Sequence, residues 1–357
     1  MTREHVTIRR AMATVAAILG AGCAEQPRQP PAPPPPPPPS AYAYVTNEDS
    51  HDLTIINADN DSAVGTIPVG TRPRGVKVSR DGKSVFVALS GSPKCPPSMP
   101  DEECEKLSSD KSKDGVAVVD AATRTVSRVL PGGSDPETFD LSVDGTKIFV
   151  SNEDAGMASI VDIATGNILA TVPVGKEPEG VTLAPDGKTV WVSGETDHDV
   201  TILDAETGKR LGRVVVGLRP RSIAFLPDGS RAYSTNEAAG TVSVIDVAKR
   251  KVIGTISMPE GSKPMSILAS ADGQRLYVSN GRGGTVSAVD VASSQVTHSV
   301  AVGKRPWGIA LSRDGRKLYS ANGPSNDVSV IDLATFTVVK TVPAGQVPWG
   351  VAIGTAP

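Results

Sequence analysis

The sequence predicts an all-β chain folded as a seven-bladed β-propeller with four-stranded blades, and three observations lead to this fold. The composition is poor in aromatic residues (4%) and contains 35 Gly and 30 Pro, which suits many short strands joined by tight turns. A Gly-x-x-Pro unit recurs seven times, and an Asp-Gly pair follows the first six units at a constant distance. Units of about 42 residues that each read as four strands are typical of propeller blades.

The repeat is regular enough to number the blades from sequence. The unit prolines are Pro73, Pro136, Pro178, Pro220, Pro264, Pro306 and Pro348, at spacings of 63, 42, 42, 44, 42 and 42 residues. Eight residues after the first six prolines come Asp81, Asp144, Asp186, Asp228, Asp272 and Asp314, each followed by Gly. The long first spacing indicates an insertion in the first blade.

Each unit is predicted to form four strands, represented by residues 180–183, 276–280, 241–246 and 252–256 in different blades. The Asp-Gly turn connects the first two strands, because Gly accepts the positive φ that a tight hairpin needs. An Asp also ends the third strand of several units, before an Ala-Thr-type turn. We interpret these residues as turn caps rather than catalysts; they are Asp162, Asp204, Asp246 and Asp332.

The two ends of the repeat region are predicted to share one blade. The chain stops nine residues after Pro348, and Ala41 aligns with the next position of the repeat. The last blade would therefore combine N-terminal strands from residues 41–69 with a C-terminal inner strand from residues 347–353. Such closure leaves no open sheet edge at the seam.

The second strands carry the motif from which a family resemblance follows. Tyr44-Val45-Thr46-Asn47 resembles the motif of bacterial, exported YVTN-repeat propellers, and residues 277–280 and 319–322 are variants of it. The resemblance covers residues 41–357 and implies seven blades. More distantly, the chain is similar to lactonase, quinoprotein amine dehydrogenase and haem-d1-type propellers, a likeness of fold that carries no function by itself.

Residues 1–22 have the layout of a signal peptide, with Arg3, Arg9 and Arg10 before a short apolar run. The run ends at Cys23 and resembles a bacterial lipobox, which implies lipidation of that Cys; cleavage near Ala24 and a freely soluble product is the alternative. Residues 23–40 form a Pro-rich linker that could reach roughly 50 Å as polyproline II. We expect an outer-membrane or periplasmic lipoprotein, otherwise a periplasmic or extracellular protein, with the lipid as its only link to a membrane.

Equivalent positions of the seven blades should form rings around the central channel, and two rings flank the unit proline. The residues before it are Arg72, Asp135, Glu177, Arg219, Lys263, Arg305 and Val347, and those after it are Arg74, Glu137, Glu179, Arg221, Met265, Trp307 and Trp349. All except Met265 and Val347 are candidate ligand-binding residues at the channel mouth.

Blades 2 and 3 would give this mouth an acidic sector, to which Glu153, Asp154, Glu195 and Asp197 add. Blades 5 to 7 and blade 1 would give it a basic and aromatic sector, made of Lys263, Arg305, Trp307, Trp349, Arg72 and Arg74. Such a mouth suits an anionic or aromatic ligand or a peptide. The alternative is structural: Arg74–Glu137 and Glu179–Arg221 form ion pairs between blades, and the two Trp side chains plug the channel.

The inserted loop, residues 91–113, should rise from the same face because it follows a second strand. It contains Cys95 and Cys104, which we expect to form a disulfide in an exported protein. We favour a role for this loop as a lid or a contact for a partner.

Evident catalytic motifs are missing from the sequence. Of four His, His51 and His198 share a loop position but lie in blades 7 and 3, so a His-based metal site is poorly supported. We therefore favour a monomeric, non-enzymatic protein without a cofactor or resident metal, which binds a protein, a peptide or a small ligand. Two alternatives stay open: a lactonase-like, metal-dependent hydrolase, and an accessory protein to periplasmic quinone or cytochrome redox enzymes.

The chain has a net charge of −3 and no basic stripe, so nucleic acid is not an expected partner.

Overall fold

A computed structural model describes residues 39–94, 99, 103 and 106–357. The signal peptide, Cys23, most of the linker and the pair Cys95 and Cys104 lie outside the described residues, so those predictions stay untested. Among the described residues, none belongs to a helix with the length and apolar character that crossing a membrane requires.

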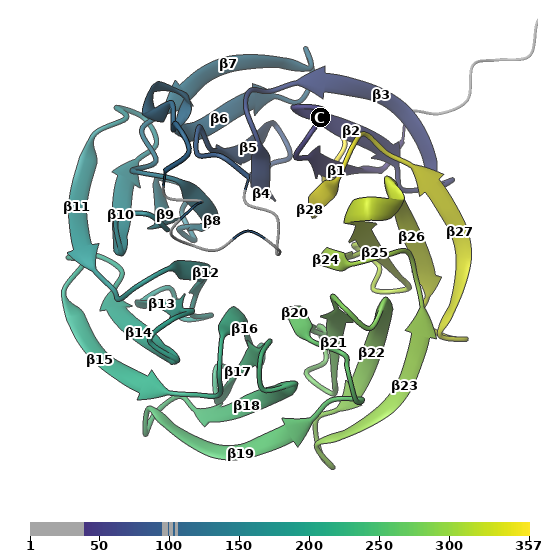
Figure 1. The fold of residues 1–357 in the computed structure, drawn as a ribbon. Helices are drawn as coiled ribbons and strands as arrows, with labels where there is room; N and C mark the ends of the chain where they lie inside the picture. The colour runs from purple at the N-terminus through teal and green to yellow at the C-terminus, as the bar shows by residue number, and fades with distance from the viewer. Residues whose placement is uncertain (1–38, 95–98, 100–102, 104–105) are drawn as a thin grey trace, which may run out of the picture. The chain divides into compact units, whose positions relative to one another are not determined.

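Seven four-stranded antiparallel sheets are arranged in a ring, which confirms the predicted propeller (Figure 1). The strands of blade 1 are β4 (Pro73–Val78), β5 (Ser84–Leu89), β6 (Gly115–Asp120) and β7 (Thr125–Leu130). Those of blade 2 are β8 (Pro136–Leu141), β9 (Lys147–Asn152), β10 (Met157–Asp162) and β11 (Ile168–Pro173). Those of blade 3 are β12 (Pro178–Leu183), β13 (Thr189–Gly194), β14 (Asp199–Asp204) and β15 (Arg210–Val215).

The remaining blades repeat this order from the channel outward. Blade 4 contains β16 (Pro220–Phe225), β17 (Arg231–Asn236), β18 (Thr241–Asp246) and β19 (Lys251–Ser257). Blade 5 contains β20 (Pro264–Ala269), β21 (Arg275–Asn280), β22 (Thr285–Asp290) and β23 (Gln295–Ala301). Blade 6 contains β24 (Pro306–Leu311), β25 (Lys317–Asn322), β26 (Asp327–Asp332) and β27 (Thr337–Pro343). Two short 3-10 helices, η1 (Lys111–Lys113) and η2 (Gly323–Ser325), lie in loops.

Blade 7 is built from both ends of the propeller, as predicted. Its inner strand β28 (Pro348–Thr355) pairs with β1 (Ala41–Asn47), which is followed by β2 (Asp52–Asn57) and β3 (Ser62–Pro68). At the junction with blade 6, the Tyr319 hydroxyl and the Lys317 ammonium group both bind the Asp61 carboxylate, the latter at 2.7 Å. The seam is therefore closed by backbone pairing within the blade and by side-chain bonds to its neighbour.

The apolar core lies between adjacent blades. One buried cluster joins Tyr44 and Leu53 of blade 7 to Val85 and Val87 of blade 1. Val, Ile and Ala make up most of the buried core. Because each blade contacts its two neighbours, closing the ring buries every large sheet face.

The third and fourth residues of the Tyr-Val-Thr-Asn motif hold the propeller together in two directions. The Thr46 hydroxyl donates to the Arg74 carbonyl of the next blade at 2.6 Å, and the Thr235 hydroxyl donates to the Met265 carbonyl at 2.7 Å. The Asn47 amide instead donates within its own blade, to the Thr54 hydroxyl at 2.9 Å. The hydroxyl thus connects the second strand of one blade to the inner strand of the next, and the amide fixes the loop between the second and third strands.

The Asp residues that end the third strands are turn caps, as interpreted from sequence. The Asp162 carboxylate accepts the backbone N–H and the hydroxyl of Thr165, both at 2.7 Å, and Asp204 and Asp332 bind Thr207 and Thr335 in the same way. These bonds to the charged form lower the pKa of each carboxyl. Their repetition in separate blades confirms a structural role.

Candidate functional site at the channel mouth

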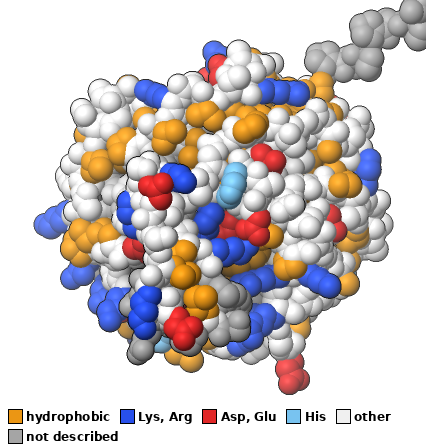
Figure 2. All heavy atoms as spheres, turned by 45° about the horizontal axis from the view of Figure 1, so that its top comes forward, with side chains coloured by type: hydrophobic (Ala, Val, Ile, Leu, Met, Phe, Trp, Pro, Cys, Tyr) orange, Lys and Arg blue, Asp and Glu red, His pale blue; other side chains and the backbone are white. Residues whose placement is uncertain are grey.

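The rings on either side of the unit proline gather at one end of the channel, together with the loops that follow the second strands. Backbone bonds show this arrangement: the N–H groups of Glu153, Glu195 and Glu237 donate to the carbonyls of Asp135, Glu177 and Arg219. The described base of the insertion lies on the same face, since Lys111 pairs with Asp154 of blade 2 and Lys94 with Glu48 of blade 7. Acidic and basic side chains lie side by side near the middle of this end (Figure 2).

The residue before each unit proline has a left-handed backbone, with φ between 44° and 60° in all seven blades. Such values are unusual for residues other than Gly, and most unusual for a β-branched one such as Val347. Side chains of the preceding blade accept the N–H groups of this turn: His51 Nδ1 binds Arg72 N at 3.2 Å, His198 Nδ1 binds Arg219 N at 3.3 Å, and Asn326 Oδ1 binds Val347 N at 2.9 Å. The two equivalent histidines therefore support the turn before the unit proline.

Arg74 is the centre of the first half of a buried ion-pair network. Its guanidinium group contacts the carboxylates of Asp135 and Glu137 and lies 3.4 Å from that of Glu153. Only 4% of the Arg74 side chain is exposed, so the charge depends on these partners for its solvation. Ser90 also donates to Asp135.

Arg221 is the centre of the second half. Its guanidinium contacts Glu179 and lies 2.6 Å from Glu195 and 2.8 Å from Glu237. The more exposed Arg219 approaches Glu195 and Glu237 from outside. The structure thus contains the predicted ion pairs Arg74–Glu137 and Glu179–Arg221, and it surrounds each with further carboxylates.

The two halves, here called the ionic network, contain more acids than bases. Six carboxyl groups form ion pairs with only three arginines, of which Arg74 and Arg221 are buried and Arg219 is more exposed. The six are Asp135, Glu137, Glu153, Glu179, Glu195 and Glu237. Burial, reinforced by neighbouring carboxylates, raises the pKa of Glu179 and that of Glu153 to about 8. The surplus acids are therefore expected to hold protons near neutral pH.

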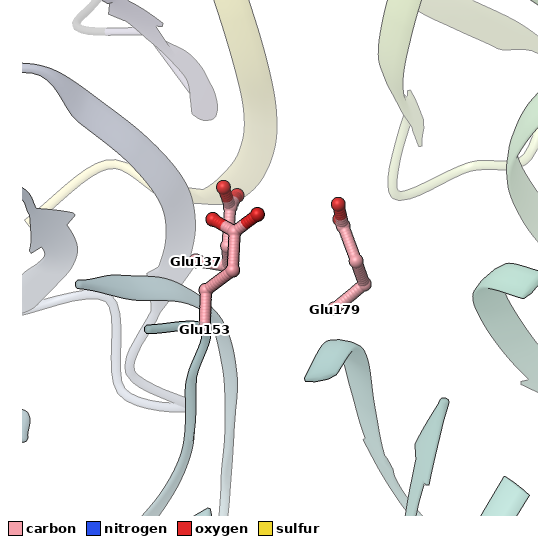
Figure 3. A group of neighbouring side chains, drawn as sticks. All are labelled: Glu137, Glu153 and Glu179. Carbon is pink, nitrogen blue, oxygen red and sulfur yellow. The ribbon is translucent and has the colours of Figure 1, made fainter. Parts of the chain in front are cut away.

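Glu137, Glu153 and Glu179 come closest to a metal site, because one oxygen of each lies within 4.8 Å of the others (Figure 3). Carboxylate oxygens are what a hard divalent cation prefers. However, Glu137 is paired with Arg74 and Glu179 with Arg221, so fixed positive charges already occupy positions around these oxygens. The donor set therefore fits arginine pairing better than it fits the metal of a hydrolase.

The aromatic sector forms a stack of three planar groups. The rings of Trp307 and Trp349 lie 5.4 Å apart, with 28° between their planes. The Arg305 guanidinium carbon lies 4.8 Å from the centre of the Trp307 ring, a cation–π distance. Both Trp side chains are partly exposed, so they form a shelf at the mouth.

A cavity of about 380 Å³ continues from the mouth along the channel. Its rim includes Glu179, Arg221, Trp307 and Trp349, so it connects the ionic network to the aromatic shelf. Below the rim the inner strands present small residues two places after each unit proline: Gly75, Thr138, Gly180, Ser222, Ser266, Gly308 and Gly350. A Cβ at Gly180 would lie 2.3 Å from the Arg221 carbonyl, so the strands approach each other too closely there for a larger residue.

The remaining ring residues bind their neighbours separately. Arg72 pairs with Glu48 at 2.8 Å and reaches the carbonyl of Pro93 in the insertion, Lys263 donates to the Ala238 carbonyl, and Glu177 accepts from Thr196.

Sequence reasoning missed Glu48 and Glu237 as members of the mouth. Both follow the Asn that ends a second strand, the position of Glu153 and Glu195 in blades 2 and 3. Alignment of that position in every blade was therefore a signal that could have found them.

Residues 181–348 match a family model described as a lactonase, seven-bladed β-propeller. Similar solved structures include a Kuenenia stuttgartiensis hydrazine synthase, with 21% identity and a TM-score of 0.66 over 78% of this chain and 89% of that chain. Putative 6-phosphogluconolactonases from Bacteroides uniformis and Bacteroides fragilis are 17% and 19% identical, with TM-scores of 0.70 and 0.71; each comparison covers 88% of this chain, and 99% and 98% of theirs. No curated protein matches the chain. These structural likenesses show the fold alone, while the family match and the seven blades together confirm the predicted likeness to lactonase propellers.

Proposed function

The chain is a lactonase-like seven-bladed β-propeller, and we propose that it binds a small ligand in its central channel without catalysing a reaction. The ligand would enter through the mouth formed by the ionic network and the aromatic shelf. The observation that carries the proposal is the cavity of about 380 Å³ between these two groups. This volume is within the range of small-molecule sites, and an apolar lining with a few polar groups at one end is typical of them.

Binding is favoured over hydrolysis by the chemistry of the lining. The described residues that line the cavity include neither His nor Cys, the side chains that most often act as a general base or a thiol nucleophile. The carboxylates at the rim are committed to Arg74 and Arg221. A rigid ring of inner strands with a preformed cavity needs little reorganisation to admit a ligand.

The proposal is tested by filling the cavity. Ser266 lines it, and Ser266→Phe should occupy much of the space that a ligand would use. Thr255→Phe, on the exposed outer strand β19, is the matched control. A library of small ring compounds is screened by ligand-observed NMR against the three proteins.

We expect compounds that bind the wild-type protein and Thr255→Phe equally and that lose at least tenfold in affinity for Ser266→Phe. Circular dichroism and the melting temperature establish that each variant is folded. Equal binding to all three folded proteins would place the ligand elsewhere and refute the proposal.

We also propose that the protein works outside the cytoplasm and is anchored by a lipid on Cys23. The layout of residues 1–22 and the Pro-rich stretch that follows support this placement. Mass spectrometry of the mature N-terminus from membranes tests it: an acylated Cys23 is expected, and an unmodified N-terminus at Ala24 would refute the anchor.

A further inference from the structure

Arg305 differs from the other arginines of the mouth. Arg72, Arg74, Arg219 and Arg221 each pair with at least one carboxylate. In the described part of the chain, no carboxylate forms an ion pair with Arg305. A partly buried charge without a counterion is costly, and it identifies a place where an incoming anion would be stabilised.

Charges of both signs surround Arg305. Burial, together with the charges of Arg221 and Arg282, lowers its pKa, whereas Glu237 and Glu48 act in the opposite direction from beyond ion-pair distance. Arg282 is exposed on the loop after β21. Since burial and the neighbouring arginines outweigh these acids, an anion that paired with Arg305 would stabilise its charge.

The stack on Trp307 also prepares the guanidinium group for binding. Stacking uses the flat face of the group and leaves the N–H donors at its edge free to point elsewhere. Those donors can form two parallel hydrogen bonds, in the plane of the guanidinium group, to two oxygens of a carboxylate or phosphate. Since Trp307 and Trp349 continue the stack toward the cavity, a flat ring that enters the cavity would meet an aromatic surface beside the cation.

We propose that Arg305 binds the carboxylate or phosphate group of the ligand, and that the flat ring of this ligand packs against the Trp307–Trp349 shelf at the cavity entrance. The inference rests on the proposed function, because it assigns a chemical class to the occupant of the same cavity. It also assigns an orientation: the anionic group lies toward blade 6 and the uncharged part lies in the channel.

The test uses three probes of nearly equal shape in isothermal titration calorimetry: 2-naphthoate, 2-naphthyl phosphate and the neutral 2-naphthamide. The two anions distinguish a carboxylate ligand from a phosphate ligand. We expect at least one anion to bind tenfold or more tightly than the amide. Arg305→Gln should abolish this preference, and the control Lys304→Gln, on the adjacent exposed residue, should retain it.

Trp349→Ala should weaken all three probes by a similar factor, because it removes the ring contact and not the charge. The anion inference is overturned if the amide binds as tightly as both anions, if Arg305→Gln keeps the preference, or if neither anion binds. If Arg305→Gln does not fold, Arg305→Lys takes its place. The affinity of each anion is then also compared at low and high salt, and a loss of anion binding at high salt supports the inference. The cavity proposal is judged separately, by the effect of Ser266→Phe on neutral ring compounds.

Discussion

Replacing Glu179 by Gln should change how the stability of the propeller depends on pH. Glu179 is buried at the junction of the two halves of the ionic network, and burial raises its pKa from 4.5 to about 8. Between these two values the folded protein holds a proton that the unfolded chain has released. The free energy of unfolding must therefore fall as pH rises through this window.

The magnitude follows from the number of protons retained. One proton held from pH 5 to pH 8 corresponds to about 4 kcal/mol of stability lost across that range. The pKa values of Glu153 and Glu195 are raised in the same direction, and these carboxyls interact with Glu179, so the three titrate as a coupled group. Carboxyls whose pKa is lowered, such as those of Glu48 and Glu237, titrate below this window and do not contribute to the slope.

Urea unfolding at pH 5, 6, 7 and 8, followed by circular dichroism and fluorescence, measures the effect. The Gln at position 179 cannot titrate, so the stability of Glu179→Gln should fall less steeply with pH than that of the wild type, and its stability relative to wild type should increase toward pH 8. The control is Glu206→Gln, since Glu206 is exposed and pairs only with Lys147 among the described residues. Parallel pH profiles for wild type and Glu179→Gln would show that Glu179 is ionised throughout, and the surplus-charge reasoning would fail.

Three further substitutions examine other parts of the fold, each by urea unfolding at pH 7. Arg221→Met should destabilise the protein by about 3–5 kcal/mol, because it leaves the buried carboxyl groups of Glu179, Glu195 and Glu237 without their shared cation; a loss below about 1 kcal/mol would contradict this role. Thr235→Val should cost about 1–3 kcal/mol by leaving the Met265 carbonyl without its donor, while the exposed Thr255→Val should be nearly neutral. Val347→Asn should stabilise by about 1 kcal/mol, because Asn tolerates the φ of 54° that strains a β-branched side chain; Val347→Ile should not, and equal effects of the two would exclude relief of strain.

The fold could be read from the sequence because a repeat multiplies each weak signal. One Asp-Gly turn or one Val-rich strand predicts little, but six turns at the same distance from a proline fix the strand order and the blade count. The seam of blade 7 could be predicted for the same reason, since Ala41 and Pro348 occupy consecutive parts of one repeat. Ring positions followed from this register, so the ion pairs Arg74–Glu137 and Glu179–Arg221 were predictable as candidates.

Sequence alone therefore determined the blade count, the closure and the residues that face the mouth, because these depend on register along the chain. Only the tertiary structure decided which of those residues are paired. Whether Arg221 pairs with three carboxyl groups, and Arg305 with none that the structure describes, depends on distances across the channel between side chains of different blades. Charge balance and burial are properties of that arrangement, and they raise the pKa of Glu153 and Glu179 while leaving Arg305 stacked on Trp307 without an acidic partner among the described residues.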